Sequence, residues 1–491
     1  MNKKPFYDAF DKKKKPTGKG KYVADDDTVE FEDDYYRKER ARNRSKFAAD
    51  GTGQASKSTG VDKTGKASPS GKPVVTTSYA DRHPTVKVEA KRAFARSKDY
   101  VEPQFMQYKT EPPCGSFSKC GGCQLQNLTY EGQLKFKQKK IEMILHSFGK
   151  VSNIIGMDNP YHYRNKVHAT FSYDKNGKIV AGIYQEDSHK VVPTTNCLIQ
   201  DERANGIIQT IRQLMPSFKM TPYDEDYDTG FMRHVLIRSS HTTGEVMVVI
   251  IGGNPIFPSK NNFVKALVKE HPYITTVVFN VNNRRTSMVL GSQETVLYGK
   301  GYIEDMLCDT RFRISPKSFY QVNSVQAEKM FNMAIGMAKL KGTENVLDAY
   351  CGIGTIGLIA SKKAGQVLGI ELNKDAVRDA NFNARMNGIE NIQFYQGDAG
   401  DFMTQMSQED ESLDLVFMDP PRSGSDDTFL ASLIKLAPKT VIYISCGPDS
   451  LARDLKVLTN NGYKVKEMFP YDMFPWTDHV ECVVKLERIN G

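Results

Sequence analysis

Residues 345–357 read NVLDAYCGIGTIG, a run of β-forming residues that passes directly into a glycine-rich turn. Gly352, Gly354 and Gly357 follow the pattern G-x-G-x-x-G between a strand and a helix. More strand-like runs follow, mostly separated by helical segments, at 366–371, 392–396, 413–419 and 440–446. This alternation predicts a doubly wound parallel α/β sheet from residue 306 onward, with a helix over 323–340 and an edge strand over 479–488.

The strand after the glycine turn ends in Glu371, 19 residues after Gly352. A carboxylate at that place can accept hydrogen bonds from ribose hydroxyls, so NAD and S-adenosylmethionine both fit. A tight turn without a ligand is the alternative. The fourth strand ends in Asp419-Pro420-Pro421-Arg422. A D/N-P-P motif there resembles methyltransferases that use S-adenosylmethionine to act on bases, and it favours that cofactor.

The fifth strand ends in Cys446, which parallel strands bring to the same sheet edge as Asp419. Gly447, Pro448 and a helical run follow. We expect the helix N-terminus to lower the pKa of this thiol below its free value of about 8.5 and favour the reactive thiolate. A cysteine on a strand is more often a small core residue, but the position beside DPPR favours catalysis.

Four motifs in order, DAYCGIGTIGL, DPPRSG, ISCGPDSLARDL and FPWTDHVECVVKL, closely resemble the RNA 5-methyluridine methyltransferases over residues 110–491. The resemblance implies a Rossmann-like class I enzyme that methylates C5 of a uridine. The expected target is 23S ribosomal RNA, with the T-loop of tRNA as the alternative. It also implies Cys446 as the nucleophile toward C6 of uracil, Glu481 as the base that removes the C5 proton, and contacts to S-adenosylmethionine at Gln321, Tyr350, Glu371 and Asp419.

Two positions depart from the family's motifs. Gly447 stands where the family has Asn, and Cys482 stands where it has Thr. The lost side-chain partner at Gly447 predicts a less fixed turn. Asp348 and Asp398 are weaker candidates at strand ends, and Asp398 could instead be a surface turn residue.

A cysteine-rich segment precedes a basic helical run. Its thiols have the spacing C-x5-C-x2-C, at Cys114, Cys120 and Cys123, and Cys197 could complete a set of four. Four thiolates suit either zinc or an iron–sulfur cluster, and spacing alone leaves both open, as it does four unligated thiols. The family resemblance implies a [4Fe–4S] cluster on these four residues.

The chain carries a formal charge of +9, and residues 1–100 account for all of it, with 24 Lys and Arg against 15 Asp and Glu. Residues 1–105 are poor in apolar side chains and predict a disordered basic arm, which would bind RNA phosphates or act as a solubilising tail. Residues 106–305 predict a mixed α/β domain with an antiparallel sheet, and residues 306–491 the catalytic domain.

Basic and aromatic side chains alternate in YHYRNKVHATF, residues 161–171, as base stacking and phosphate contact require. An edge strand is the alternative, and Arg233 and His234 are further candidates for RNA contact.

We see no long apolar run and no secretory signal, so we expect a cytoplasmic protein with no membrane span and no obligate protein partner. Two competing hypotheses are a methyltransferase for exocyclic amines and a non-catalytic iron–sulfur RNA-binding protein.

Overall fold

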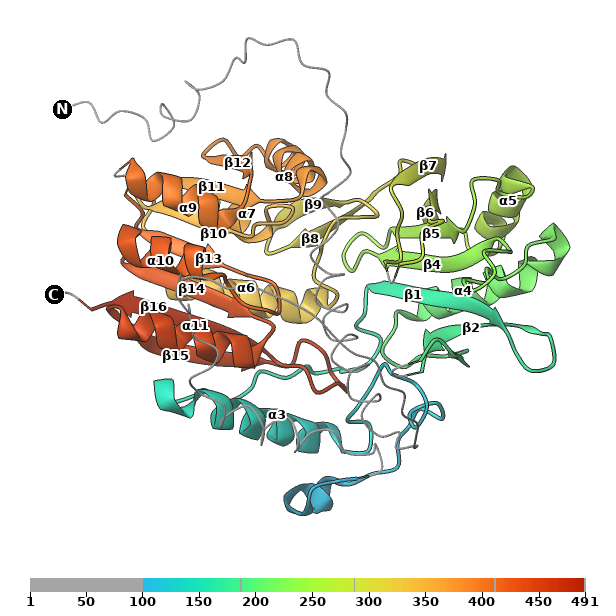
Figure 1. Cartoon of the computed structure of the whole chain (residues 1–491), viewed down its shortest axis with the longest axis horizontal. Coiled ribbons are helices and arrows are strands. Elements are labelled where there is room, and N and C mark those ends of the chain that lie inside the picture. The colour runs from blue at the N-terminus through green and yellow to red at the C-terminus, as the bar shows by residue number, and fades with distance from the viewer. Residues whose placement is uncertain (1–99, 186–187, 287, 410–411, 490–491) are drawn as a thin grey trace, which may run out of the picture. The chain divides into compact units, whose positions relative to one another are not determined.

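Two seven-stranded sheets organise the computed structural model, which describes residues 100–185, 188–286, 288–409 and 412–489 (Figure 1). The arm predicted over residues 1–105 therefore lies almost wholly outside the described residues. Its last residues enter a short 3-10 helix, η2 (Pro103–Tyr108). Within the described ranges, no helix is long and apolar enough to cross a membrane.

The catalytic sheet has the strand order β12-β11-β10-β13-β14-β16-β15. Its first five strands are parallel, as predicted, and β16 is antiparallel to both of its neighbours. The strands are β10 (Asn345–Ala349), β11 (Gln366–Glu371), β12 (Ile392–Gln396), β13 (Leu415–Met418), β14 (Thr440–Ser445), β15 (Tyr463–Tyr471) and β16 (Glu481–Arg488).

The prediction that residues 479–488 form an edge strand is wrong. β16 lies between β14 and β15, and β15 takes the edge. The buried and exposed residues of β15 alternate over much of its length, and it contains Pro470, which an edge strand tolerates because one of its sides needs no hydrogen-bond donor. The local pattern of β16 did not reveal its place, because strand order depends on which strands pair in the folded sheet.

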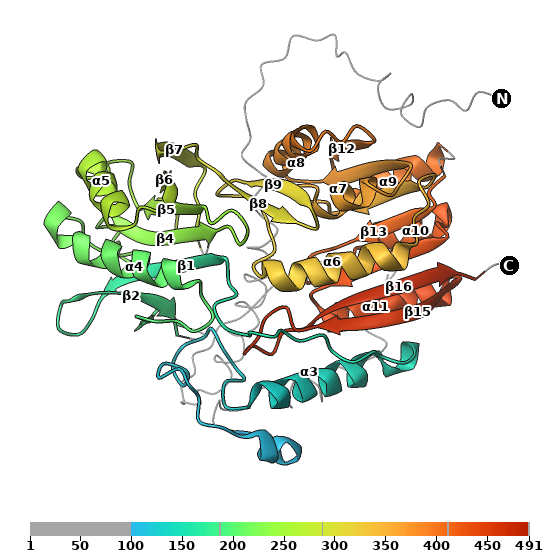
Figure 2. The ribbon, with the colours of Figure 1, turned by 180° about the vertical axis from the view of Figure 1, so that it is seen from behind.

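Helices cover both faces of the catalytic sheet, as a doubly wound fold requires (Figures 1 and 2). The predicted helix over 323–340 is confirmed as α6 (Ser324–Ala338). It shares one face with α7 (Thr355–Ser361) and α8 (Lys374–Met386). The other face carries α9 (Ala399–Gln408), α10 (Asp427–Leu436), α11 (Pro448–Asn460) and, from far earlier in the chain, α3 (Tyr130–Leu145), which is followed by η3 (His146–Phe148).

The second sheet has the order β3-β2-β1-β4-β5-β6-β7. It is antiparallel as predicted, except that β5 and β6 are parallel and joined through a helix. Its strands are β1 (Lys166–Tyr173), β2 (Ile179–Tyr184), β3 (Val191–Pro193), β4 (Met232–Ser239), β5 (Val246–Gly252), β6 (Ile274–Val281) and β7 (Gln293–Tyr298). The helices α4 (Glu202–Leu214), followed by η4 (Pro216–Phe218), and α5 (Lys260–Glu270) pack on one face.

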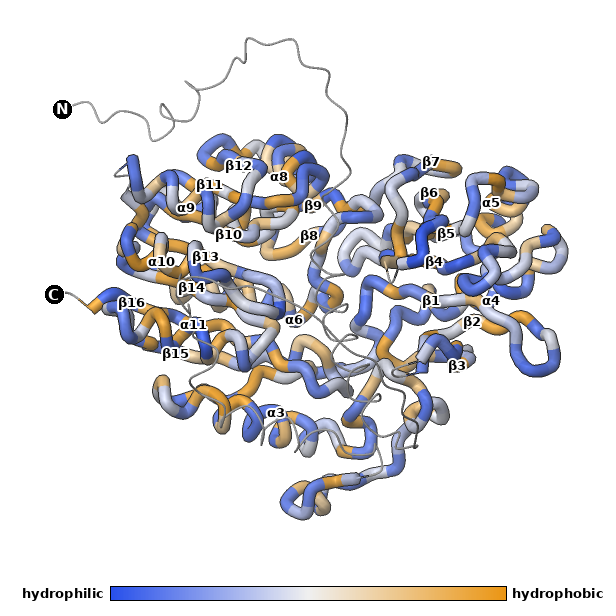
Figure 3. The backbone as a smooth tube through the Cα atoms, viewed as in Figure 1, coloured by the Kyte–Doolittle hydropathy of each residue, from blue (hydrophilic) through white to orange (hydrophobic). Residues whose placement is uncertain are grey.

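The opposite face of this second sheet shares a core with the catalytic sheet. The hairpin of β8 (Ile303–Leu307) and β9 (Thr310–Ile314) lies in the same core. The central strand β4 is buried along its whole length although it contains strongly hydrophilic residues, visible as blue segments in Figure 3. Buried polar residues therefore accompany the apolar core where the two sheets are joined.

Candidate active site

The glycine turn after β10 opens the site. Gly352 and Gly354 have positive φ angles of 55° and 83°, which residues with side chains rarely adopt. A Cβ on Gly354 would lie 2.6 Å from the ring of Phe394, whereas a Cβ on Gly352 would meet nothing within 4 Å. The turn is thus closely packed on one side and open at Gly352, as the approach of a ligand to the backbone requires.

Glu371, at the end of β11, holds this turn in place. One oxygen of its carboxylate accepts the Gly352 N–H at 3.0 Å, and the other accepts the Asn373 N–H at 2.8 Å. A carboxylate oxygen can accept more than one hydrogen bond, so Glu371 keeps capacity for ribose hydroxyls. The structure therefore brings the two parts of the predicted nucleotide motif together.

Tyr350 and Gln321, the two other predicted cofactor contacts, are held by different neighbours. The Tyr350 hydroxyl donates to Ser425 Oγ at 3.4 Å, and its ring packs on Phe429 with centroids 5.3 Å apart. Gln321 is buried, and its carbonyl oxygen accepts a hydrogen bond from Asn165 Nδ2 at 3.0 Å. Asn165 belongs to the segment 161–171 and directly precedes β1, so this segment helps to hold the residue that is predicted to contact the cofactor.

Cys446, Glu481 and Asp419 converge at one edge of the catalytic sheet, where β13 and β14 end and the antiparallel strand β16 begins. The antiparallel register of β14 and β16 pairs Ser445 with Cys482, and one further step places Cys446 opposite Glu481. Asp419 directly follows β13, the parallel neighbour of β14 on the other side. Glu481 is 4% exposed, while Cys446 is half-buried. A partly exposed cysteine therefore stands beside a shielded carboxyl group.

Burial controls the protonation of these three groups. Burial, followed by the charges of Glu481 and Asp419, raises the pKa of Cys446 to about 12, although the charge of Arg422 acts in the opposite direction. Burial likewise raises the pKa of Glu481 to about 8 and that of Asp419 to about 7. The prediction that the helix N-terminus lowers the pKa of Cys446 is therefore wrong, because desolvation and two nearby acids outweigh it.

The turn after Cys446 is well anchored despite Gly447. The Gly447 N–H donates to Ser445 Oγ at 3.2 Å, and the Ser450 hydroxyl bridges the carbonyl oxygens of Gly447 and Arg422 at 2.8 and 2.9 Å. The side chain that the family places here is absent, but Ser450 connects this turn to the DPPR loop. The expectation of a less fixed turn is not met.

Comparison with known proteins agrees with this geometry. A model of the family described as tRNA (Uracil-5-)-methyltransferase matches residues 129–489. An RNA methyltransferase of Halalkalibacterium halodurans is 40% identical over 410 residues, which cover 82% of this chain and 89% of the relative. One of Listeria monocytogenes is 41% identical, over 77% of this chain and 84% of the relative.

This chain belongs to the tRNA (uracil-5-)-methyltransferase family. A solved structure is also similar, that of the Pyrococcus abyssi tRNA (uracil-54, C5)-methyltransferase in complex with S-adenosyl-L-homocysteine. It is 28% identical with a TM-score of 0.64, and the match covers 75% of this chain and 86% of that one. Membership in the family establishes an RNA methyltransferase that uses S-adenosylmethionine and has a mixed α/β fold.

The four predicted cluster cysteines of this family member gather in one neighbourhood. Cys114, Cys123 and Cys197 border a small apolar cluster with Phe117 and Trp476. Burial and, to a smaller extent, the charges of Cys197, Cys120 and Cys114 together raise the pKa of Cys123 to about 12. In the described ranges, no group of three or more His, Cys, Asp or Glu is placed to hold a single metal ion. Cys120 and Cys123 are buried and Cys114 and Cys197 are half-buried, and four cysteine thiolates are a ligand set that iron–sulfur clusters take.

The other candidate residues of this methyltransferase have structural partners. Arg233 and His234 are 2% and 5% exposed, and Arg233 donates hydrogen bonds to Glu225 and to backbone carbonyls, so the prediction that these two contact RNA is wrong. Asp398 caps α9 by accepting the N–H groups of its first turn. Asp348 is buried and accepts the Gly357 N–H at 2.7 Å, which supports the glycine turn.

Sequence reasoning did not single out Arg422 as a site residue. It is the exposed fourth residue of DPPR, and its charge lowers the pKa values of both Cys446 and Glu481. The DPPR motif could have indicated this role, since a cation beside a buried thiol and a buried acid favours their ionised forms.

Proposed function

We propose that this chain methylates C5 of a uridine in RNA through a covalent adduct between Cys446 and C6 of the uracil ring. One observation supports the proposal, namely the register of β14 and β16, which pairs Ser445 with Cys482 and so brings the next residue, Cys446, beside Glu481. When bound, S-adenosylmethionine supplies the methyl group and a positive charge. Gln321, Tyr350, Glu371 and Asp419 are the residues that would hold it.

The residues of this chain have distinct roles in the proposed reaction. The Cys446 thiolate adds to C6, and the electrons of the C5=C6 bond move toward C5 and the C4 carbonyl. C5 would then take the methyl group from the sulfonium, and the electrons of the broken C–S bond would stay on that sulfur. Glu481 removes the proton from C5, the C–H electrons restore the C5=C6 bond, and the C6–S electrons return to sulfur. The uracil must leave its stack to reach Cys446.

Trapping with RNA that contains 5-fluorouridine tests this mechanism. The fluorine at C5 cannot be removed as a cation, so the enzyme should remain attached to the methylated base. We expect a covalent complex with the wild-type chain and none with Cys446→Ala. Full methylation by Cys446→Ala would overturn the covalent mechanism and favour a methyltransferase for exocyclic amines. No binding of S-adenosylmethionine in calorimetry would favour a non-catalytic RNA-binding protein.

The target within RNA stays a prediction, with 23S ribosomal RNA as the expected substrate. The T-loop of tRNA is the second candidate, because the similar solved structure is that of a tRNA (uracil-54, C5)-methyltransferase. Mapping 5-methyluridine in ribosomal RNA and tRNA from a deletion strain distinguishes them, since only the true target should lose the modification and regain it on complementation.

We also propose that Cys114, Cys120, Cys123 and Cys197 hold a [4Fe–4S] cluster. Support comes from the family resemblance and from the grouping of the four thiols. Protein purified without oxygen should contain iron and acid-labile sulfide in equal amounts, and Cys123→Ser should lose both. Stoichiometric zinc without sulfide would contradict the proposal.

A further inference from the structure

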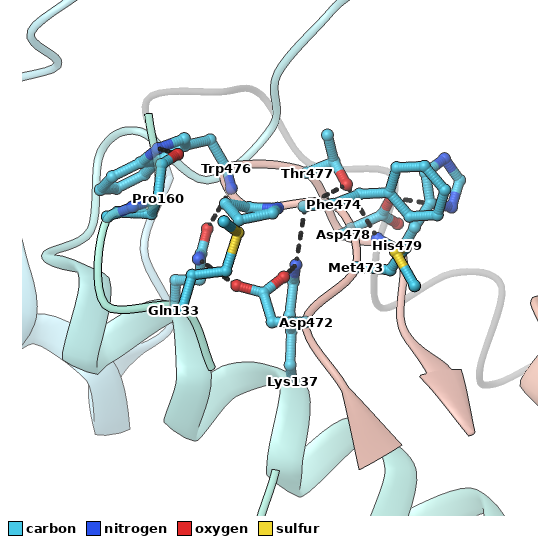
Figure 4. Close-up of polar contacts among 12 residues, drawn as sticks. Gln133, Lys137, Pro160, Asp472, Met473, Phe474, Trp476, Thr477, Asp478 and His479 are labelled. Carbon is cyan, nitrogen blue, oxygen red and sulfur yellow. Dashed lines mark hydrogen bonds and ion pairs between the residues drawn. The ribbon is translucent and has the colours of Figure 1, made fainter. Parts of the chain in front are cut away.

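The segment Asp472–Val480 connects β15 to β16 and ends directly at Glu481, so its conformation sets where that carboxyl group enters the site. Helix α3, more than 300 residues earlier in the chain, holds this segment (Figure 4). The side chains of α3 that hydrogen-bond to this segment recur at helical spacing on one face of the helix, at Tyr130, Gln133, Lys137 and Lys140.

Lys137 and Asp472 form the centre of this contact. The Lys137 ammonium group lies 2.5 Å from Asp472 Oδ1 and donates to the Phe474 carbonyl oxygen at 3.0 Å. Both side chains have no exposure to solvent. The second carboxylate oxygen of Asp472 accepts hydrogen bonds from the Tyr130 hydroxyl at 2.9 Å and from Gln133 Nε2 at 3.0 Å. Every charge in the pair is thus satisfied by α3 or by the segment itself.

The same helix face binds the segment at two further points. The backbone N–H of Trp476 donates to Gln133 Oε1 at 2.5 Å. Nearer to Glu481, Lys140 donates to the Asp478 carbonyl oxygen at 2.9 Å. Figure 4 shows Gln133 and Lys137 rising from α3 toward the backbone of the segment, with Asp472 between them. α3 therefore contacts the segment at its start, its middle and its end.

Stability alone does not account for a fully buried ion pair. Two well-packed apolar side chains of similar size often stabilise a fold as well or better, because burying two charges costs a large desolvation free energy. A buried pair that is fully hydrogen-bonded instead fixes one arrangement of the elements that carry it. Here those elements are α3 and the segment that leads to Glu481.

We propose that Lys137 and Asp472 are positioning residues that hold Glu481 where it can take the C5 proton of the methylated adduct. The inference rests on the proposed function, in which Glu481 is that base. The affected step moves the C5 proton to the Glu481 carboxylate, returns the C–H electron pair to the C5=C6 bond, and releases Cys446 as a thiolate. Attack of Cys446 on C6 and methyl transfer precede this step and do not need the base.

Two RNA substrates separate these steps. With uridine RNA, Lys137→Met should lower kcat by about tenfold to a hundredfold, because a small displacement of a catalytic group has effects of this size. The covalent complex should then accumulate during turnover, as it should with Glu481→Gln. With 5-fluorouridine RNA, where the base is not used, Lys137→Met should form the trapped adduct at the wild-type rate.

Asp472→Asn is the second variant, since it removes the charge but can retain the hydrogen bonds from Tyr130 and Gln133. It should likewise lower kcat with uridine RNA and form the 5-fluorouridine adduct at the wild-type rate. Lys135→Met on the same helix is the matched control, because Lys135 is exposed and pairs only with residues outside the segment, and it should behave as wild type. Unchanged kcat in both variants, or equal loss of turnover and 5-fluorouridine trapping, would overturn the inference. The wild-type adduct tests the proposed function separately.

Discussion

Gly447 shows how one residue shapes the turn behind the nucleophile. A Cβ there would lie 2.6 Å from the carbonyl oxygen of Arg422 and 2.7 Å from Ser450 Oγ. The space that the family fills with Asn is thus occupied by the DPPR loop and a serine. The departure at this position is consistent with its surroundings, because the same loop contributes Arg422 next to Cys446.

Gly447→Asn should therefore impair the enzyme although it restores the family's usual residue. Crowding of this kind costs about 1–3 kcal/mol, which we expect as a lower free energy of unfolding and a slower formation of the 5-fluorouridine adduct. Gly388→Asn is the control, because Gly388 has a φ of 64°, which Asn tolerates, and nothing lies within 4 Å of its Cβ. Equal behaviour of the two variants would contradict the prediction.

The raised pKa values predict how the rate depends on pH. Cys446 and Glu481 act in their deprotonated forms, and burial raises their pKa values to about 12 and about 8. Both are therefore mostly protonated near pH 7, and the active forms increase as pH rises. Single-turnover methylation of uridine RNA should accelerate between about pH 6 and pH 9, by up to about tenfold per pH unit for one required deprotonation. A rate that falls over this range would contradict the assignment.

At the scale of elements, the glycine turn depends on packing between α7 and β12. Gly354 has a φ of 83° and lies against the ring of Phe394, so a methyl group there meets both backbone strain and a close contact. Gly354→Ala should lower the free energy of unfolding by about 1–3 kcal/mol and weaken binding of S-adenosylmethionine. Denaturant titration and calorimetry measure the two effects. Gly342→Ala, which has a φ of 90° and open surroundings, isolates the backbone strain.

At the scale of the whole molecule, the buried carboxylate of Asp305 connects the second sheet to the segment that precedes α6. It accepts hydrogen bonds at 2.7 Å from the hydroxyls of Ser240 and Thr242, which follow β4, and at 3.3 Å from Tyr320, which precedes α6. Both the second sheet and the segment that carries Gln321 are therefore fixed to the β8–β9 hairpin.

Asp305→Ala should lower the free energy of unfolding by about 3 kcal/mol or more, because it leaves several buried donors without an acceptor. It should also weaken binding of S-adenosylmethionine through the displaced Gln321 segment. Asp158→Ala, at a fully exposed side chain, should change the stability by less than about 0.5 kcal/mol. A stable Asp305→Ala protein would contradict the prediction that this carboxylate is needed for stability.

The sequence by itself determined the parallel strands, the glycine turn with Glu371, and the candidates Cys446 and Glu481. These features are predictable because strand and helix periodicity is local and the motifs are short. The tertiary structure alone decided the place of β16 inside the sheet, the high pKa of Cys446, and the burial of Arg233 and His234. It also decided that α3 holds the segment before Glu481. Each of these depends on which distant residues pack together, since desolvation, strand order and buried pairing arise only when the chain is folded.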